Sequence, residues 1–357
     1  MSARCDKTRL FKASFSFWGV LFLAVLASSL LSACADRPLS ESVLSGETMG
    51  TTYSVKYINQ PGEAHSARTE EEVAANVARL LTHLDKLLST YQQDSELNQL
   101  NRAEVGVDVP VSSILWQVLL IADQTYRDSN GAFDPSVGPL VDLWGFGPTA
   151  APDNVPPDAV IESLLIDTGF KHLDFEPNKQ AVVKRSDIRL DLSAVAKGYA
   201  ADRVAELLFD MGLQRFMVEV GGELRLAGTN GRNQPWRIAI EVPELLRGGV
   251  QEVVVATDVG VATSGDYRNY FERDGVRYSH TIDPRTGRPI RHNLASATVI
   301  AGSAAQADAL ATAFMVLGTE QSLALANRNE IAVYLISRGP DGWNTSLSKS
   351  FETYLQR

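Results

Sequence analysis

From residue 51 onward, apolar positions recur with two alternating periods, one typical of helices and one typical of strands. After Thr69 and Glu72, which match the signature of a capping box, apolar residues are spaced three and four positions apart and predict an amphipathic helix. Further helices are predicted over residues 112–127, 158–168, 193–211, 303–317 and 319–328. Alternating or β-branched runs predict strands at 51–58, 216–220, 236–242, 252–257, 260–264, 268–272, 276–280, 296–300 and 331–336.

These elements predict an α+β fold with a mixed or antiparallel sheet core and packed helices. The order has no steady β-α-β rhythm and no Gly-x-Gly-x-x-Gly after the first strand, which argues against a Rossmann domain. Residues 148–157 contain four prolines and are expected to form a loop. Residues 131–147 combine four glycines and two prolines with two Phe and one Trp. We expect an irregular, aromatic-rich loop there, which either walls a pocket for a planar ligand or is a structural Ω-loop.

The N-terminal segment has the features of a secretory signal. Four cations lie among the first 12 residues, and a charge-free apolar run follows to Cys34. The run ends in Leu-Ser-Ala-Cys, which is similar to a bacterial lipobox whose cysteine is lipidated, for example with palmitate, and becomes the first mature residue. The alternative is an uncleaved transmembrane helix. We expect a signal over residues 1–33, a polar tether over 34–45 and one globular domain over 46–357.

Composition narrows the classes of function. The formal net charge of −10 argues against a nucleic-acid partner, which requires a concentrated basic surface. The two cysteines, Cys5 and Cys34, both precede the expected globular domain. That domain therefore has no disulfide, no cysteine nucleophile and no thiolate metal site.

An acid and a hydroxyl lie four residues apart in the predicted helix over 303–317, at Asp308 and Thr312. Residues at that spacing share one helix face, with about 5–6 Å between their Cβ atoms. Both are hard oxygen ligands of the kind that Mg²⁺ prefers, together with carbonyls, waters and phosphates. The alternative is a solvated acid beside a threonine that bonds its own helix.

A second segment, residues 190–202, holds the start of another predicted helix. Asp191 or Ser193 is a candidate cap, and Lys197, one turn into the helix, is a candidate phosphate contact. Gly198 costs about 1 kcal/mol in a helix interior relative to alanine. Its missing side chain must therefore allow either close helix packing or close approach of a ligand.

Other candidate residues are weaker when each is taken alone. Met49 and Tyr91 are expected either to pack against a planar ligand or to be an ordinary turn residue and a half-buried ring. His280 lies in a polar, turn-rich stretch and is expected at the edge of a pocket. Asp266 lies on a glycine turn beside a hydroxyl.

Taken in order, seven segments make the chain similar to the FAD:protein FMN transferases, the ApbE family. They are Met-Gly-Thr from Met49, Phe-Asp-Pro-Ser-Val-Gly-Pro-Leu…Leu-Trp-Gly-Phe-Gly from Phe133, Asp-Leu-Ser-Ala-Val-Ala-Lys-Gly-Tyr-Ala from Asp191, Val-Gly-Gly-Glu from Val220, Ala-Thr-Ser-Gly-Asp-Tyr from Ala262, His-x-Ile-Asp-Pro-x-Thr-Gly-x-Pro from His280 and Asp-x-x-x-Thr from Asp308. No single motif is decisive, but seven in register are specific.

The resemblance implies a T-fold-related domain that moves FMN from FAD onto a threonine hydroxyl of a target protein and releases AMP, with Mg²⁺ as cofactor. Implied targets are flavin-bearing subunits of membrane respiratory complexes, such as the sodium-pumping NADH:quinone reductase. It also implies a lipid-anchored protein that faces the periplasm, more often on the inner membrane, with the outer membrane left open. Two alternatives keep the same site: an FAD pyrophosphatase that uses water as the acceptor, and a non-catalytic FAD-binding lipoprotein.

The resemblance also assigns roles to residues of this chain. Those implied to hold FAD are Met49, Tyr91, Ala132, Phe133, Asp134, Asp191, Lys197 and His280. Those implied to bind Mg²⁺ are Asp308 and Thr312 through their side chains and Ala194 through its carbonyl. His280, and after it Asp266, is expected to accept the threonine proton. Many relatives carry a second acid just before the threonine, where this chain has Ala311, so either a second metal site or metal affinity in general is expected to be weaker.

Overall fold

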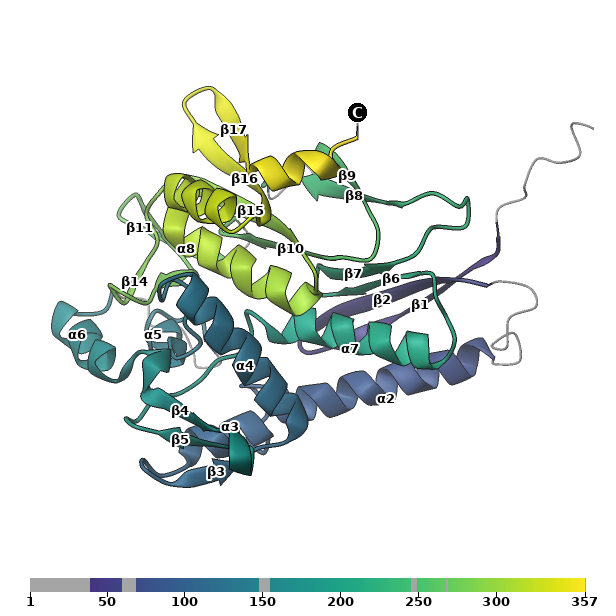
Figure 1. Cartoon of the computed structure of the whole chain (residues 1–357). Helices are drawn as coiled ribbons and strands as arrows, with labels where there is room; N and C mark the ends of the chain where they lie inside the picture. Colours follow the sequence, from purple (N-terminus) through teal and green to yellow (C-terminus); the bar gives the residue numbers. More distant parts are fainter. Residues whose placement is uncertain (1–38, 60–68, 148–154, 245–248, 268, 357) are drawn as a thin grey trace, which may run out of the picture. The chain divides into compact units, whose positions relative to one another are not determined.

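In the computed structural model, the described part of the chain comprises residues 39–59, 69–147, 155–244, 249–267 and 269–356 (Figure 1). The expected signal over residues 1–33, the lipidation candidate Cys34 and the first residues of the tether lie outside this part. Residues from Leu39 onward belong to one unit, which is described below.

An eight-stranded sheet forms the centre of the fold, in the order β1-β2-β6-β7-β10-β15-β16-β17 (Figure 1). Its strands are β1 (Glu41–Thr48), β2 (Thr51–Ile58), β6 (Phe216–Val220), β7 (Glu223–Ala227), β10 (Gly260–Gly265), β15 (Leu294–Ala301), β16 (Ala332–Gly339) and β17 (Gly342–Leu347). Every neighbouring pair in this sheet is antiparallel. The α+β prediction is therefore confirmed, in its antiparallel form.

The first strand corrects the expected extent of the tether. Residues 41–45 were assigned to the tether, but they pair with residues 54–58 of β2. The N–H of Leu39 also donates to the carbonyl of Gly231 at 2.8 Å. Periodicity did not reveal this strand because Leu44 is its one buried apolar residue, while Val43 is 53% exposed.

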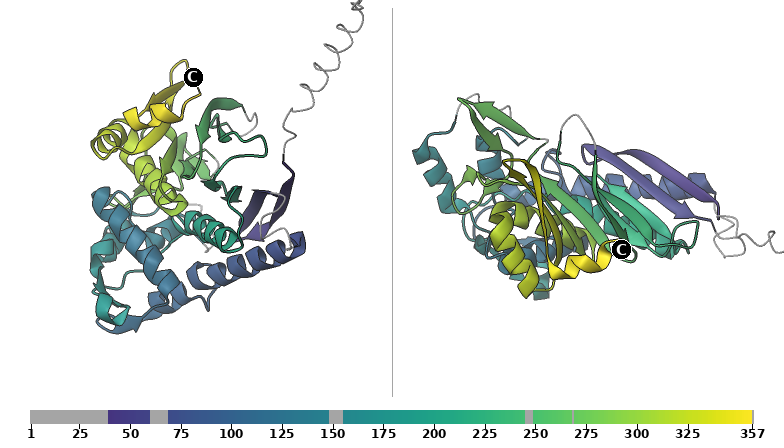
Figure 2. Two further views of the ribbon diagram at one scale, coloured as in Figure 1. Left: turned by 45° about the vertical axis from the view of Figure 1, so that its right-hand side comes forward. Right: turned by 90° about the horizontal axis from the view of Figure 1, so that it is seen from above.

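The two faces of the sheet are covered by different elements, and the long helices lie on one of them (Figure 2). Side chains along its strands alternate between these faces. Val299 and Val333 point to the face that packs against helices. Their neighbours Ile300 and Tyr334 join a separate apolar cluster with the paired strands β8 (Trp236–Glu241) and β9 (Val250–Ala256) and with the C-terminal 3₁₀ segment η5 (Lys349–Tyr354). This period of two is the pattern expected for a strand that is buried on both sides.

The helices are α2 (Glu70–Leu88), α3 (Glu96–Arg102), α4 (Ser113–Asp128), α5 (Gly138–Leu143), α6 (Asp158–Asp167), α7 (Ala196–Asp210) and α8 (Ala304–Arg328). Smaller sheets contain β3 (Asp108–Pro110), β4 (Leu173–Glu176) and β5 (Ala181–Lys184), the pair β8 (Trp236–Glu241) and β9 (Val250–Ala256), the pair β11 (Tyr270–Arg273) and β12 (Val276–Ser279), and the pair β13 (Ile282–Asp283) and β14 (Arg288–Pro289). The predicted capping box is present, because Thr69 and Glu72 each accept the other's backbone N–H.

Helix α8 lies against the sheet and carries Asp308 and Thr312 (Figure 1). Two helices were predicted here, over residues 303–317 and 319–328, and Gly318 does interrupt the helix with φ 76° and ψ 174°. Length and composition would let α8 cross a membrane, but most of its residues are buried within the fold, as in a core helix.

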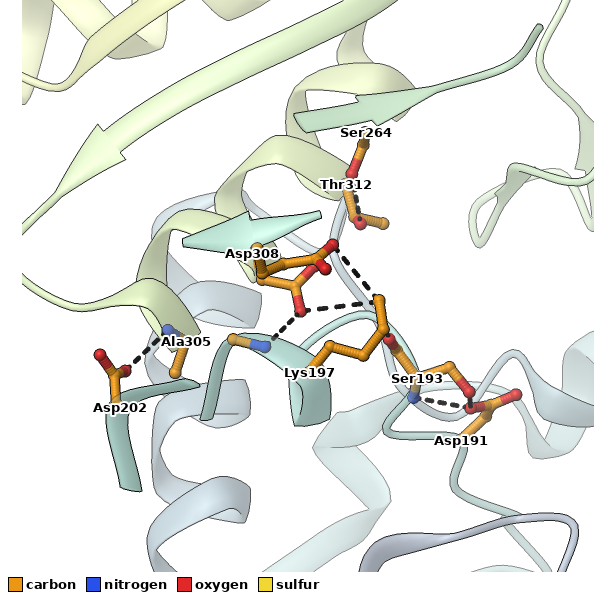
Figure 3. A network of polar contacts seen from close by, with 10 residues as sticks. Asp191, Ser193, Lys197, Asp202, Ser264, Ala305, Asp308 and Thr312 are labelled. Carbon is orange, nitrogen blue, oxygen red and sulfur yellow. Dashed lines mark hydrogen bonds and ion pairs between the residues drawn. The ribbon is translucent and has the colours of Figure 1, made fainter. Parts of the chain in front are cut away.

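Helices α7 and α8 cross at Gly198. A Cβ at this position would lie 2.3 Å from the carbonyl oxygen of Ala304 and 2.8 Å from the Cα of Ala305. The carboxylate of Asp202, one turn further along α7, accepts the N–H groups of Ala304 and Ala305, both at 2.9 Å (Figure 3). Close helix packing therefore accounts for the glycine, and Asp202 fixes the start of α8 on α7.

The segment over 131–147 was predicted to have no regular element, and this was wrong in one respect. It contains the six-residue helix α5, which begins with Gly138 and Pro139. Proline is compatible with the first turn of a helix, because its missing N–H would have no partner there. Trp144, at the end of α5, is 2% exposed and donates its Nε1–H to the carbonyl of Gly287 at 2.8 Å.

Candidate active site

One cavity, of ≈ 460 Å³, lies where the first turn of α7, the first half of α8 and the end of β10 meet the loop over 131–147. Ten of the twelve residues predicted for the site line it: Tyr91, Ala132, Phe133, Asp134, Asp191, Ala194, Lys197, His280, Asp308 and Thr312. Two other described clefts, of ≈ 460 and ≈ 500 Å³, lie on helix surfaces and contain none of these residues. The cavity is therefore the candidate active site.

Asp308 and Thr312 lie on one face of α8, one turn apart, and both line the cavity (Figure 3). Asp308 is 2% exposed, and its Oδ2 accepts the N–H of Gly198 at 3.1 Å. The hydroxyl of Thr312 is 3.2 Å from the hydroxyl of Ser264 on β10. The predicted pairing of a helical acid and a hydroxyl is thus present in the fold, and the solvated alternative does not apply to Asp308.

The ammonium group of Lys197 lies between two carboxylates. Its Nζ is 3.8 Å from Asp308 Oδ2 and 3.5 Å from Glu223 Oε1, and it donates to the carbonyl of Ser193 at 2.9 Å (Figure 3). Burial alone would lower the pKa of Lys197, but the charges of Asp308 and Glu223 outweigh that effect and raise its pKa above the ordinary value. The side chain therefore stays protonated and can meet an anionic ligand.

The environment of the two carboxylates beside Lys197, those of Asp308 and Glu223, disfavours their charged forms. Burial raises the pKa of Asp308, an effect that the Lys197 ammonium and the Gly198 N–H only partly offset. Burial and the charge of Asp308 together raise the pKa of Glu223 to about 8. The buried carboxylates of Asp308 and Glu223 share the single ammonium of Lys197, which cannot neutralise both of them when both are ionised.

The turn before α7 leaves the carbonyl of Ala194 outside the helix. Ala194 precedes Val195, the N-cap of α7, so regular helix geometry assigns its carbonyl no intrahelical donor. The N–H of Gly198, in the first turn, has no intrahelical acceptor either and donates to Asp308. Ala194 lines the cavity, which fits the role that the resemblance implies for it.

These donors fit a hard divalent cation. In the described ranges, no three His, Cys, Asp or Glu side chains gather around one point, so a cation there must also use hydroxyl or carbonyl oxygens. Asp308, Thr312 and the Ala194 carbonyl supply that mixture, which suits Mg²⁺. Glu223, which also lines the cavity, has a buried Oε2 with no hydrogen-bond partner among the described residues.

His280 has one ring nitrogen engaged and the other available. Its Nδ1 lies 3.0 Å from the carbonyl of Asn269, and because a carbonyl can only accept, Nδ1 carries the proton. Nε2 is then the unprotonated nitrogen of the neutral ring. Burial lowers the pKa of His280 below 6.5, against the opposing effects of Asn269 and Asp266, and the charge of Lys197 lowers it further. This geometry suits a general base.

The aromatic loop contributes its backbone and its rings to the cavity wall. Phe133 is 2% exposed, whereas Tyr91 is 67% exposed at the cavity edge and is free to stack on a planar ligand. Asp134 lines the cavity but turns its oxygens toward the loop: Oδ1 accepts the N–H and hydroxyl of Ser136, and Oδ2 accepts the N–H of Phe170. The carboxylate of Asp134 thus holds the loop in shape.

Asp191 was predicted as a helix cap or an FAD contact, and Ser193 as the alternative cap. The cap of α7 is Val195, with no side-chain hydrogen bond, so neither capping prediction is correct. Oδ1 of Asp191 accepts the N–H and hydroxyl of Ser193 at 2.8 and 2.5 Å (Figure 3). This local turn delays the helix and positions Asp191 on the cavity wall.

Two predicted residues lie away from the cavity. Met49 occupies a turn with φ 48° between β1 and β2 and packs against the main apolar cluster. The structure does not place Asp266 as a base, because its carboxylate, 5% exposed, accepts two hydrogen bonds from Arg338 at 2.9 and 2.5 Å. Arg277 also lies 4.0 Å away. A carboxylate held by arginines in this way stabilises structure.

Of the four carboxylates that line the described cavity, Glu223 is the one that was not predicted for the site. It begins β7 directly after Gly221 and Gly222, which both have positive φ and form the tight turn from β6. A Cβ on Gly221 would lie 2.9 Å from the Lys197 side chain and 3.4 Å from Glu223 Oε2. The double glycine before an acid, at the end of a strand, was the available signal.

The fold and the cavity together define a class of protein. An antiparallel sheet backed by helices presents a buried acid, a hydroxyl, a lysine and a neutral histidine to one cavity, a set of groups that can bind an anionic ligand and accept a proton. The chain belongs to the ApbE family, whose model matches residues 49–335.

Known members of the family are similar over nearly the whole chain. The FAD:protein FMN transferase of Vibrio cholerae is 45% identical over 94% of this chain and 99% of its own length. That of Haemophilus influenzae is 40% identical, covering 92% and 96%. The solved flavin transferase ApbE from Vibrio cholerae superposes with a TM-score of 0.82 at 44% identity, covering 89% of this chain and 100% of that one. The apo form of the Pseudomonas stutzeri flavinyl transferase ApbE gives 0.81 at 41% identity, covering 89% and 97%.

Proposed function

We propose that this protein is an FAD:protein FMN transferase that moves FMN from FAD onto a threonine hydroxyl of an acceptor protein. The observation that carries this proposal is that the Asp308–Thr312 pair, the Lys197 ammonium and His280 all belong to one cavity. The relatives named above carry the same activity in their names, over nearly the same length of chain.

The reaction exchanges one phosphate linkage for another. The threonine oxygen forms a bond to the phosphorus that carries riboflavin, the anhydride bond between the two phosphates of FAD breaks, and AMP leaves. The threonine proton passes to Nε2 of His280, since Nδ1 already bears a proton that it donates to Asn269. As in other phosphoryl transfers, positioning and charge stabilisation do most of the work.

Asp308, Thr312 and the Ala194 carbonyl would hold Mg²⁺, which neutralises phosphate charge and makes the phosphorus more electrophilic. Lys197 adds a fixed ammonium whose position is set by the Ser193 carbonyl. Tyr91 offers an exposed ring at the cavity edge for stacking on a flat ring of FAD. The buried 132–135 segment closes the wall of the cavity and excludes water there.

The proposal extends to location. The apolar N-terminal run that ends at Cys34 supports a lipid anchor on a protein that faces the periplasm, where acceptor subunits of membrane respiratory complexes such as the sodium-pumping NADH:quinone reductase present their threonines. Cys34→Ser is expected to release the protein from membranes in cell fractionation. Persistent anchoring of that variant would revive the transmembrane alternative.

The activity is tested by incubating the purified protein with FAD, Mg²⁺ and a candidate acceptor domain, and by measuring both acceptor mass and AMP. A gain of the FMN mass on the acceptor, abolished when its target threonine is replaced by valine, supports transfer. AMP release at the same rate without acceptor would instead identify a pyrophosphatase. Retention of intact FAD under both conditions would leave a binding protein.

A further inference from the structure

Glu223 is a buried carboxylate that the proposed reaction does not use. It is 5% exposed, at the start of β7, and its Oε1 lies 3.5 Å from Lys197 Nζ. Its Oε2 has no hydrogen-bond partner among the described residues. A buried carboxylate oxygen without a partner is costly, so its retention on a cavity wall indicates that a ligand completes it.

The charges around Glu223 show what kind of ligand is missing. Asp308 and Glu223 both approach the same Nζ, at 3.8 and 3.5 Å, so one ammonium serves two carboxylates. When both carboxylates are ionised, the group has a formal excess of one negative charge inside a largely buried site. A cation on the cavity side would correct this excess, whereas an anionic phosphate alone would add to it.

Helix α8 offers no second carboxylate to the cavity. Ala311, just before Thr312, is 0% exposed and belongs to an apolar cluster with Phe314 and Leu335. An acid at this position would thus meet apolar side chains, while Glu223 reaches the cavity from the sheet. The second carboxylate of the site comes from β7.

We propose that Glu223 is part of the divalent-cation site, where its unpartnered oxygen faces the same cation as Asp308 and where Lys197 competes with that cation for both carboxylates. The inference rests on the proposed metal dependence, and it adds a binding residue on a different element. An oxygen-only donor set suits hard divalent cations such as Mg²⁺, Mn²⁺ and Ca²⁺.

The test is a titration of the full-length, detergent-solubilised protein with Mn²⁺, in which free Mn²⁺ is read from its electron paramagnetic resonance signal. Glu223→Gln keeps the size of the side chain but removes its charge, and we expect it to weaken Mn²⁺ binding by about tenfold or more. Lys197→Met removes the competing ammonium and is expected to strengthen Mn²⁺ binding. Glu219→Gln, four residues earlier and outside the cavity lining, is the matched control and should bind as the unmodified protein does.

The outcomes separate this inference from the proposed function. If Asp308→Asn loses Mn²⁺ while Glu223→Gln binds it as tightly as the unmodified protein, Glu223 is not part of the site and the transferase proposal stands. If neither the unmodified protein nor any variant binds Mn²⁺, both the metal assignment and the role of Glu223 are wrong. Should Glu223→Gln fail to fold, judged by circular dichroism, Lys197→Met decides: equal or weaker binding contradicts the proposed competition.

Discussion

The backbone N–H of Gly198 donates a 3.1 Å hydrogen bond to Oδ2 of Asp308, which joins the first turn of α7 to the candidate metal ligand on α8. The N–H lies in the first turn of α7, where helical N–H groups have no intrahelical acceptor, so it is available to orient the Asp308 carboxylate. The backbone of α7 therefore positions one of the three oxygen donors proposed for the cation on α8.

Gly198→Ala should destabilise the fold and disturb the site. The added Cβ would lie 2.3 Å from the Ala304 carbonyl oxygen, which is backbone and cannot rotate away. Overpacking of this kind costs about 1–3 kcal/mol, to be measured as the free energy of unfolding in urea. Gly302→Ala, where a Cβ meets nothing within 4 Å, is the control and should leave that free energy unchanged. Equal stability of both variants would contradict the close α7–α8 crossing.

At acidic pH, the fall of the reaction rate should follow the protonation of the His280 ring. Only the neutral ring can accept the threonine proton, and burial lowers its pKa below 6.5. The value of kcat/KM should therefore stay level as pH falls to 6.5 and decline only at lower pH. His280→Gln should lower kcat/KM by about 100-fold or more and remove this decline.

His83, an exposed histidine on α2, provides the control for that experiment. His83→Gln should reproduce both the rate and the pH profile of the unmodified protein. An inflection that persists unchanged in His280→Gln would assign the proton transfer to another group.

Asp266→Asn should affect stability more than chemistry. The carboxylate accepts two hydrogen bonds from Arg338, and an amide can keep only one of them. We expect a loss of about 1–3 kcal/mol in the free energy of unfolding, with kcat preserved at temperatures where the variant is folded. Asp274→Asn, in the β11–β12 turn with a side chain 93% exposed, should change neither quantity. A large fall in kcat at unchanged stability would restore Asp266 as the base.

Periodicity predicted the elements that bury one clear face. The helix that Thr69 and Glu72 begin, the break at Gly318 and most central strands follow from apolar spacing and local caps. Strand β1 was missed because its polar residues satisfy backbone pairing at a sheet edge, where little apolar burial is needed. The six residues of α5 were hidden among glycines and prolines.

The site was predictable where the chemistry lies on one element or matches a family motif. Asp308 and Thr312 lie four residues apart on α8, and that spacing alone predicts that they share one helix face. The spacing of Asp266 and Arg338, 72 residues apart, carries no such information, so the ion pair that occupies Asp266 could not be foreseen. For Glu223 the double glycine before it was a local signal, but its position beside Lys197 and Asp308 follows only from the order of the sheet, which brings β7 beside α8.

The most direct test of the account is the covalent transfer of FMN by the unmodified protein and by Asp308→Asn, measured as acceptor mass with FAD and Mg²⁺ present. Asparagine keeps an oxygen for the Gly198 N–H, so the fold should survive and the circular dichroism spectrum should be unchanged. We predict that the unmodified protein adds the mass of FMN to the acceptor and releases an equal amount of AMP, while Asp308→Asn does neither. Undiminished transfer by a folded Asp308→Asn would contradict the central claim that this buried carboxylate on α8 organises the reaction.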